Sequence, residues 1–392
     1  MPARSSRSIL ADLVAFDTTS RNSNLELIAY IEAYLSDFGI ASRRIYNEAG
    51  DKASLWASVG PEGDGGLILN GHTDCVPVDG QPWTTSPFML TERDGRLFGR
   101  GSCDMKGFLA CVLAAVPKML GAPLLRPFHF AFSHDEEIGC VGVRGMLAEL
   151  AAHGPRVEAC IVGEPTSMQV VNGHKGGRAY RCRIQGLAVH SSLAPQGVNA
   201  IEVAAELIVF LRRVASRLAE GPRDVDFDLP QSTISVGLIE GGTAINIVPD
   251  RCSFVFEFRN LIEVDQEEIF GKIRRYAEET LLPAMQATDP LTTIRFEPIY
   301  QYPAHAITPD HPLVTQVKVA LGRNGHSKVA YGAEAGLFLS ELGLPTLLCG
   351  PGSIVQAHRP DEYVDVEQLD LCDVFLDKLI KRQTTGQSFS SN

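Results

Sequence analysis

The chain has 392 residues and a net charge of −12 at pH 7, which disfavours nucleic acid and anionic membranes as partners because an acidic surface repels both. Its composition, 45% hydrophobic and 21% charged, is typical of a globular protein. No stretch approaches the roughly 18 apolar residues of a membrane span. Since the chain is longer than a domain with a single hydrophobic core usually is, we expect two domains.

The cysteines indicate a compartment. There are nine, scattered along the chain and without a CxxC pair. Such usage is typical of a reducing environment in which thiols stay free, so we expect a cytoplasmic protein. Near the N-terminus, Asp12 interrupts the apolar segment that follows the arginines, which favours an amphipathic helix over a signal peptide.

Strands and helices alternate through the first part of the chain. Residues 8–38 have helical periodicity in two pieces, with Asn24 as the expected N-cap of the second. Buried strands are expected at 53–59, 67–70, 128–132 and 159–162, and helices at 105–120 and 141–152. This alternation predicts an α/β fold with a mostly parallel sheet and helices on its faces.

The pattern changes near Gly177. Alternating strands are expected at 178–184, 232–239 and 252–259, and helices at 199–218 and 266–279. A strand–helix–strand–strand–helix–strand order predicts a ferredoxin-like α+β domain. After about residue 290 the α/β style resumes, with a helix at 311–321, a strand at 346–348 and a helix at 366–380. We therefore expect one domain built from residues 1–177 and 291–392, with residues 178–290 inserted into it.

The stretch Leu67–Asp74 carries the first chemical signal. Its apolar run ends in Gly71, which we expect to turn the backbone out of the sheet so that His72 and Asp74 project from the strand end. An imidazole makes a good metal ligand when a carboxylate fixes its other ring nitrogen. Taken alone, the motif fits a strand-end histidine capped by a turn aspartate equally well.

Residues that commonly bind metal ions also follow other expected strands. These side chains are His72, Asp104, Glu136 with Glu137, Glu164 and, late in the chain, His358. A parallel sheet collects strand ends along one edge, and carboxylates gathered there repel one another unless they are paired or bound to metal. Nitrogen and oxygen ligands suit a divalent metal such as Zn²⁺. Five ligands exceed one tetrahedral site and suit two metals about 3.5–4 Å apart that share a carboxylate.

Each of these residues also has an ordinary interpretation. Asp104 could be a helix N-cap, and Glu136 and Glu137 could be first-turn acids that complement a helix dipole. Glu164 precedes a proline in a common turn pair, and His358 lies in a polar loop. All of these interpretations would have to hold together, which favours the metal site.

A family resemblance becomes visible at this point. The chain resembles the co-catalytic zinc deacylase and exopeptidase family, which includes acetylornithine deacetylases, succinyl-diaminopimelate desuccinylases, aminoacylases and glutamate-releasing carboxypeptidases. The similar motifs lie in family order between residues 70 and 363, and they are GHTDCVPV, GRGSCDMKG, SHDEEIGCVG, GEPTSMQ, GLAVHSS, GGTAINIVPD and GPGSIVQAHRPDEY. Within the family, GEPTSMQVVNGHKG, YGAEAG and CGPGSIVQAHRPDEYV most resemble the acetylornithine deacetylases. The resemblance implies a metallopeptidase-like catalytic domain with an inserted lid and dimerisation domain, and a homodimer formed through the latter.

The resemblance also implies roles for the metal-type residues. Asp104 would bridge two divalent metal ions, zinc or, in its place, cobalt. His72 and Glu164 would complete one metal site, and Glu137 and His358 the other. The family often has a cis peptide bond after the bridging aspartate, here between Asp104 and Met105.

Further roles follow from the same resemblance. Glu136 would be the catalytic acid and base, and Asp74 would orient His72. His190 of the inserted domain would reach an active site across the dimer interface to hold the oxyanion. Asn246 and Arg259 would contact the substrate carboxylate. Taken singly, those three would be a capping histidine, a turn residue and a solvated strand-end arginine.

The implied activity is metal-dependent hydrolysis of the amide bond of an N-acyl amino acid. The best candidate reaction converts N2-acetyl-L-ornithine and water into L-ornithine and acetate, a step of arginine biosynthesis. A rival within the same class is another N-acyl amino-acid hydrolase, such as a succinyl-diaminopimelate desuccinylase, or a dipeptidase. A rival from another class is a non-catalytic metal- or amino-acid-binding homologue, against which the presence of Glu136 argues.

Overall fold

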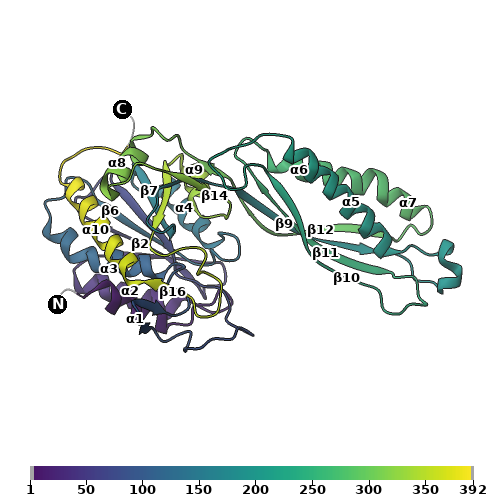
Figure 1. The fold of residues 1–392 in the computed structure, drawn as a ribbon, viewed down its shortest axis with the longest axis horizontal. Helices are drawn as coiled ribbons and strands as arrows, with labels where there is room; N and C mark the ends of the chain where they lie inside the picture. The colour runs from purple at the N-terminus through teal and green to yellow at the C-terminus, as the bar shows by residue number, and fades with distance from the viewer. Residues whose placement is uncertain (1–3, 390–392) are drawn as a thin grey trace. The chain divides into compact units, whose positions relative to one another are not determined.

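A computed structural model describes residues 4–389 and divides the chain into two compact units (Figure 1). Unit 1 extends to His174 and resumes at Ala306–Lys328 and from Ala333 onward. Unit 2 comprises Lys175–His305 and Val329–Gly332. The second unit is therefore inserted into the sequence of the first.

A nine-stranded sheet organises unit 1, in the order β1-β2-β6-β3-β7-β15-β8-β13, with β14 paired to β8. Strands β6, β3, β7 and β15 run parallel, whereas the pairs β1–β2, β2–β6 and β15–β8 are antiparallel. The strands are β1 (Ser42–Tyr46), β2 (Ala53–Val59), β3 (Leu67–His72), β6 (Phe128–Ser133), β7 (Ala159–Pro165), β8 (Val171–His174), β13 (His305–Ala306), β14 (Ser327–Val329) and β15 (Thr346–Gly350). The expected mostly parallel α/β architecture is confirmed.

Every residue of β3, β6 and β7 is buried, as expected for parallel strands covered on both faces. Helices α1 (Ser6–Ala15), α3 (Lys106–Gly121) and α10 (Val366–Gln383) pack together, as do α4 (Gly142–His153) and α9 (Ala335–Leu342). The remaining elements of unit 1 are α2 (Leu25–Asp37), α8 (Pro312–Leu321) and a small sheet of β16 (Tyr363–Asp365), β5 (Arg96–Phe98) and β4 (Thr91–Arg93).

Unit 2 is a four-stranded antiparallel sheet in the order β10-β11-β9-β12. Its chain order, β9-α5-β10-β11-α6-β12, gives the expected ferredoxin-like arrangement. Phe254, Phe256 and Phe258 alternate along β11 and bury one sheet face under the helices. The elements are β9 (Gly176–Gln185), a 3₁₀ turn (Ser191–Gln196), α5 (Ala200–Ala219), β10 (Thr233–Gly241), β11 (Arg251–Asn260), α6 (Gln266–Tyr276), a π-helical segment (Ala277–Leu281), α7 (Leu282–Gln286) and β12 (Thr293–Tyr302).

The boundary of the inserted unit lies later than expected. We expected it to end at residue 290, but β12 follows that point and pairs with β9 from Thr293 to Tyr302. Pro298 interrupts the strand pattern, and the pairing register shifts between Pro298 and Tyr300. Such a residue is tolerated because β12 is an edge strand. The unit therefore continues to His305, and its first boundary lies at residue 174/175 rather than 177/178.

Gly71 has a different role from the expected turn. Strand β3 continues through it to His72, and Gly71 pairs with Phe132 of β6. A Cβ atom on Gly71 would lie 2.7 Å from Met105 Cε and 2.9 Å from Leu109 Cδ2. The glycine therefore allows close packing of β3 against α3, and the strand itself carries His72 to the sheet edge.

The cysteines and the helices also bear on the expected compartment and on membrane insertion. All nine cysteines are buried and without disulfide bonds. Within residues 4–389, no helix combines the length and apolar character needed to cross a bilayer.

Candidate metal centre and active site

The metal-type side chains of unit 1 meet at one edge of the parallel sheet. His72 is the last residue of β3, Glu136 and Glu137 follow the end of β6, and Glu164 lies near the end of β7. Asp104 precedes α3, and the expected cis peptide bond joins it to Met105. Because the carboxyl ends of parallel strands share an edge, the fold brings together residues far apart in sequence.

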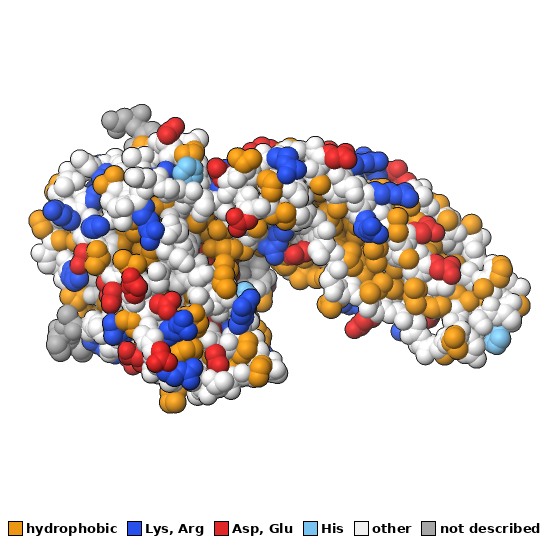
Figure 2. Space-filling view, viewed as in Figure 1, with side chains coloured by type: hydrophobic (Ala, Val, Ile, Leu, Met, Phe, Trp, Pro, Cys, Tyr) orange, Lys and Arg blue, Asp and Glu red, His pale blue; other side chains and the backbone are white. Residues whose placement is uncertain are grey.

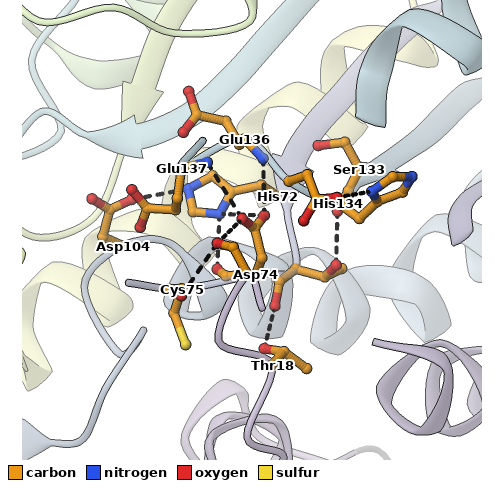
Figure 3. Close-up of polar contacts among 12 residues, drawn as sticks. Thr18, His72, Asp74, Cys75, Asp104, Ser133, His134, Glu136 and Glu137 are labelled. Atoms are coloured by element: carbon orange, nitrogen blue, oxygen red, sulfur yellow. Dashed lines mark hydrogen bonds and ion pairs between the residues drawn. The ribbon is translucent and has the colours of Figure 1, made fainter. Parts of the chain in front are cut away.

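These residues form two groups that could each hold a metal ion. In the group of His72, Asp104 and Glu164, one ligand atom from each residue lies within 4.8 Å of the others. The same holds for the group of Asp104, Glu137 and His358. Asp104 belongs to both, with Oδ1 3.0 Å from His72 Nε2 and Oδ2 3.3 Å from His358 Nε2. Figure 3 shows the Glu137 and Asp104 carboxylates side by side.

Asp74 supports this centre from behind. His72 Nδ1 lies 3.0 Å from the backbone oxygen of Asp74 and 3.5 Å from its carboxylate, so it can donate a hydrogen bond there while Nε2 faces Asp104. The Asp74 carboxylate also accepts a hydrogen bond from Ser20 Oγ at 2.7 Å. It accepts two more from the backbone N–H groups of Glu136 at 3.1 Å and Glu137 at 3.3 Å (Figure 3). One side chain thus orients His72 and fixes the glutamate turn.

The carboxyl groups are under electrostatic strain. Burial and the nearby charge of Asp104 raise the pKa of Glu137 to about 7, and the same two causes raise the pKa of Glu164 well above its ordinary range. Burial lowers the pKa of His72, but its contacts with Asp104 and Asp74 raise it further, to well above 6.5. Contacts with Asp104 and Glu137 raise the pKa of His358 to about 11. Protons on the histidines therefore offset the carboxylate charges.

The donor set fits divalent metal ions. Glu137 Oε1 is buried and has no hydrogen-bond partner among residues 4–389. Imidazole nitrogens and carboxylate oxygens are ligands that Zn²⁺ accepts, and two groups that share one carboxylate suit a two-metal centre. A cation in each group would take the place of the histidine protons and balance the crowded carboxylates.

Comparison with known proteins places the chain in a family. The sequence model of peptidase family M20/M25/M40 matches residues 68–382. The chain belongs to this family. It is therefore a metallo-hydrolase of the M20 type, as the sequence motifs indicated.

Individual relatives agree with this membership. Acetylornithine deacetylase of Pectobacterium carotovorum subsp. carotovorum (strain PC1) is 37% identical over 357 residues, which cover 90% of this chain and 89% of the relative. Acetylornithine deacetylase of Myxococcus xanthus is 34% identical over 395 residues, covering 97% and 98%. The M20 family metallo-carboxypeptidase Sso-CP2 from Sulfolobus solfataricus has the same fold, with a TM-score of 0.80, 18% identity and coverage of 97% and 100%.

Glu136 stands apart from both metal groups of the M20 centre. Its backbone is fixed by Asp74, and its side chain extends away from that residue (Figure 3). Cys140 Sγ donates a hydrogen bond to Glu136 Oε1 at 3.3 Å. Burial is the largest cause that raises the pKa of Glu136 well above its ordinary range. A carboxyl group held beside, and outside, the metal groups can exchange a proton with a reacting molecule.

The other three expected site residues lie in unit 2, and their roles stay predictions. His190 is exposed and its Nδ1 lies 2.8 Å from Ser192 Oγ. Asn246 lies close to it, since its backbone oxygen accepts a hydrogen bond from Ser191 at 3.0 Å. Arg259 lies near the far end of β11, about 25 Å along the strand from its start.

Arg259 is held within unit 2. Its Nη2 lies 3.0 Å from Glu257 Oε2, and its Nη1 donates a hydrogen bond to the Tyr302 hydroxyl. The guanidinium also lies over the rings of Tyr300 and Tyr302, 5.9 and 5.8 Å from their centroids. These contacts fix the direction of the guanidinium group.

Two residues that support the centre, Arg100 and Glu362, were not predicted from the sequence. Glu362 accepts hydrogen bonds from the backbone N–H groups of Cys103 at 2.9 Å and Asp104 at 3.0 Å, and it pairs with Arg100. Both Arg100 and Glu362 stood inside the quoted motifs GRGSCDMKG and GPGSIVQAHRPDEY, which was the available signal. Neither residue belongs to the two metal groups, and the Glu362 carboxylate is occupied by backbone N–H groups and Arg100, contacts that the side-chain pattern does not reveal.

Proposed function

We propose that this protein hydrolyses the amide bond of an N-acyl amino acid, with N2-acetyl-L-ornithine as substrate and L-ornithine and acetate as products. The proposal depends on one observation. Two groups of side chains that could each hold a metal ion share Asp104, and the carboxyl group of Glu136 belongs to neither group. The two acetylornithine deacetylases, similar over about nine-tenths or more of the chain, support the choice of acyl group and amino acid.

The proposed centre holds two divalent ions, zinc or cobalt. His72 and Glu164 would hold one ion, Glu137 and His358 would hold the other, and Asp104 belongs to both groups. Bound ions supply Lewis-acid activation of water and of the amide carbonyl. Glu137 contributes a buried oxygen that lacks a protein partner, which supports its assignment as a ligand.

Proton transfer is assigned to Glu136. Its carboxylate takes a proton from the attacking water and later gives it to the amine that leaves, so one group serves as base and then as acid. Burial holds the pKa of Glu136 well above its ordinary range, as a group that both takes and returns a proton near neutral pH requires. Asp74 keeps the His72 ring in the orientation that presents Nε2 to the centre.

Unit 2 is proposed to act as a lid that excludes water and supplies the remaining contacts. His190 donates a hydrogen bond to the developing oxyanion, a contact worth about 3–4 kcal/mol in comparable sites. Asn246 and Arg259 contact the substrate carboxylate. Asn246 lies in the loop that precedes β11 and Arg259 lies near the other end of that strand, so we infer that a single subunit does not bring both to the same carboxylate.

This separation supports a homodimer in which the two subunits complete each other's sites. Strand β10 is an edge of the unit 2 sheet, and its Leu238 and Ile239 side chains are 62% and 54% exposed. Figure 2 shows hydrophobic side chains gathered over the strands of unit 2. We propose that the β10 edge pairs with a second copy. The buried free thiols support action in the cytoplasm.

A substrate panel tests the proposed function. The metal-loaded protein is incubated with N-acetyl-ornithine, N-succinyl-diaminopimelate, N-acetyl-citrulline and a set of dipeptides, and release of the amine is measured. We expect kcat/KM to be highest for N-acetyl-ornithine. A higher value for the succinyl substrate or for a dipeptide would assign the rival activity, and no hydrolysis of any substrate by a metal-replete protein would indicate a binding protein.

A further inference from the structure

Two loops of unit 1 lie against each other next to Asp104, the residue shared by the two metal groups. One contains Gly99–Asp104, and the other contains His358–Glu362. Strand β16 pairs with β5 so that Tyr363 lies opposite Phe98, which places the residue before Tyr363 beside the first loop. The backbone N–H of Gly99 donates to the backbone oxygen of Glu362 at 2.9 Å.

The Glu362 carboxylate binds the first loop through its backbone. Its Oε1 accepts from the N–H groups of Cys103 at 2.9 Å and Asp104 at 3.0 Å, and its Oε2 accepts from Gly101 at 3.1 Å. Glu362 is 1% exposed. A carboxylate is an acceptor at both oxygens, so it satisfies all three donors at once, which a carboxamide cannot do.

Arg100 balances the buried charge and extends the contact to the second loop. Its side chain is fully buried, with Nη1 2.5 Å from Glu362 Oε2 and Nη2 2.6 Å from Gln81 Oε1. The guanidinium lies 5.0 Å from the centroid of the Trp83 ring, a cation–π contact. Gln81 Nε2 in turn donates to the backbone oxygen of His358 at 3.4 Å. The network therefore touches the backbone of both Asp104 and His358.

We propose that Glu362 and Arg100 are positioning residues that hold the Asp104 and His358 loops in register, so that the bridging carboxylate is in place before a metal ion binds. Partners behind the ligands commonly orient them and affect metal affinity. The inference rests on the metal ligands of the proposed function. A purely structural role for Glu362 would affect stability alone, whereas a positioning role also affects the affinity and the coordination geometry of the bound metal.

The test compares Glu362→Gln with Asp365→Asn. Asp365 lies outside both loops and pairs with Arg96 at 3.3 Å, so it is a control for the loss of a nearby carboxylate that also pairs with an arginine. Metal-free proteins are titrated with Co²⁺ in a calorimeter, and the visible spectrum of the bound cobalt is recorded. Thermal unfolding checks that each variant is folded.

We expect Glu362→Gln to bind cobalt about 10–100-fold more weakly, with an altered spectrum, while Asp365→Asn matches the wild type. We also expect kcat to fall more than KM changes. Wild-type affinity and spectrum in a folded Glu362→Gln would overturn the positioning role.

A second variant keeps the test decisive if Glu362→Gln does not fold. Gln81→Ala removes the link between Arg100 and His358 without removing a buried charge. Weaker cobalt binding than in the wild type supports the proposal, and unchanged binding overturns it. A wild-type protein that binds no cobalt would instead overturn the proposed metal groups themselves, so the two failures are distinguishable.

Discussion

Asp74 accepts a hydrogen bond from the backbone N–H of Glu136, with 3.1 Å between nitrogen and oxygen. The same carboxylate lies 3.5 Å from His72 Nδ1. One buried side chain therefore fixes both a proposed metal ligand and the proposed proton-transfer group. This dual contact makes Asp74 more than a partner of His72.

Replacing Asp74 should weaken metal binding and turnover together. In Asp74→Asn the side-chain amide nitrogen, a donor, would face one of the backbone N–H groups that now donate to the carboxylate, and that hydrogen bond would be lost. We expect metal affinity to fall about 10–100-fold, with a loss of kcat in the metal-saturated protein. Titration with Zn²⁺ and steady-state kinetics measure the two effects. Ser20→Ala removes a single donor to Asp74 and should have a smaller effect, and equal effects of both variants would contradict this interpretation.

Glu136→Ala should separate chemistry from metal binding. Because Glu136 lies outside both metal groups, the variant should keep both ions. Its kcat should fall by about 10²–10⁴-fold, the range of a lost general acid–base group. Elemental analysis and kinetics on the same sample measure both quantities. An active, metal-replete Glu136→Ala protein would refute the assigned role.

Metal binding should become more stabilising as pH rises. In the metal-free protein the pKa of Glu137 is raised from 4.5 to about 7, and that of His358 from 6.5 to about 11. Both groups bind protons more tightly in the folded state. Their contribution to stability is present below the ordinary values and is lost as pH rises through the raised ones.

A metal ion competes with these protons, so its benefit grows as they leave. We predict that Zn²⁺ raises Tm more at about pH 8 than at about pH 6. Scanning calorimetry with and without metal measures the difference. A shift that is the same at both pH values, or larger at the lower one, would disagree with proton release on binding.

The proposed dimer contact at the β10 edge should be sensitive to charge. Leu238→Glu introduces a carboxylate on the exposed edge strand β10, where burial against a second copy would be unfavourable. We predict that the molar mass in light scattering falls from that of a dimer toward that of a monomer. Val319→Glu is the control, because Val319 is 76% exposed on α8 of unit 1. A wild-type chain that is monomeric at every concentration would rule out the dimer.

Gly163 should be intolerant of a side chain. A Cβ atom there would overlap the ring of Phe108, which is fully buried in α3. We expect Gly163→Ala to lower the free energy of unfolding by about 1–3 kcal/mol through overpacking. Denaturant unfolding measures this change. Gly271→Ala, in open space within α6, should instead raise the stability by about 0.5–1 kcal/mol.

The sequence predicted the elements whose signal is local. The apolar runs at 53–59 and 128–132 became β2 and β6 almost residue for residue, because central strands that are buried on both faces are mostly apolar. The meeting of the candidate metal ligands could be predicted for a related reason. Parallel strand ends share an edge, so side chains that follow several strands meet without any motif that links them.

Features that depend on distant pairing could not be predicted in the same way. Strand β12 contains Pro298 and is defined by its pairing with β9, more than a hundred residues earlier in the chain. Gly71 serves packing against α3 rather than a turn, which depends on Met105 and Leu109. Glu362 acts on backbone N–H groups, and these donors leave no trace in the side-chain pattern.

The most direct measurement is anomalous X-ray diffraction from crystals of the zinc-loaded protein, recorded at the metal absorption edge. We predict two peaks about 3.5–4 Å apart on either side of the Asp104 carboxylate. One should lie beside His72 and Glu164, and the other beside Glu137 and His358. A single peak, or peaks remote from Asp104, would contradict a two-metal centre built on that shared carboxylate.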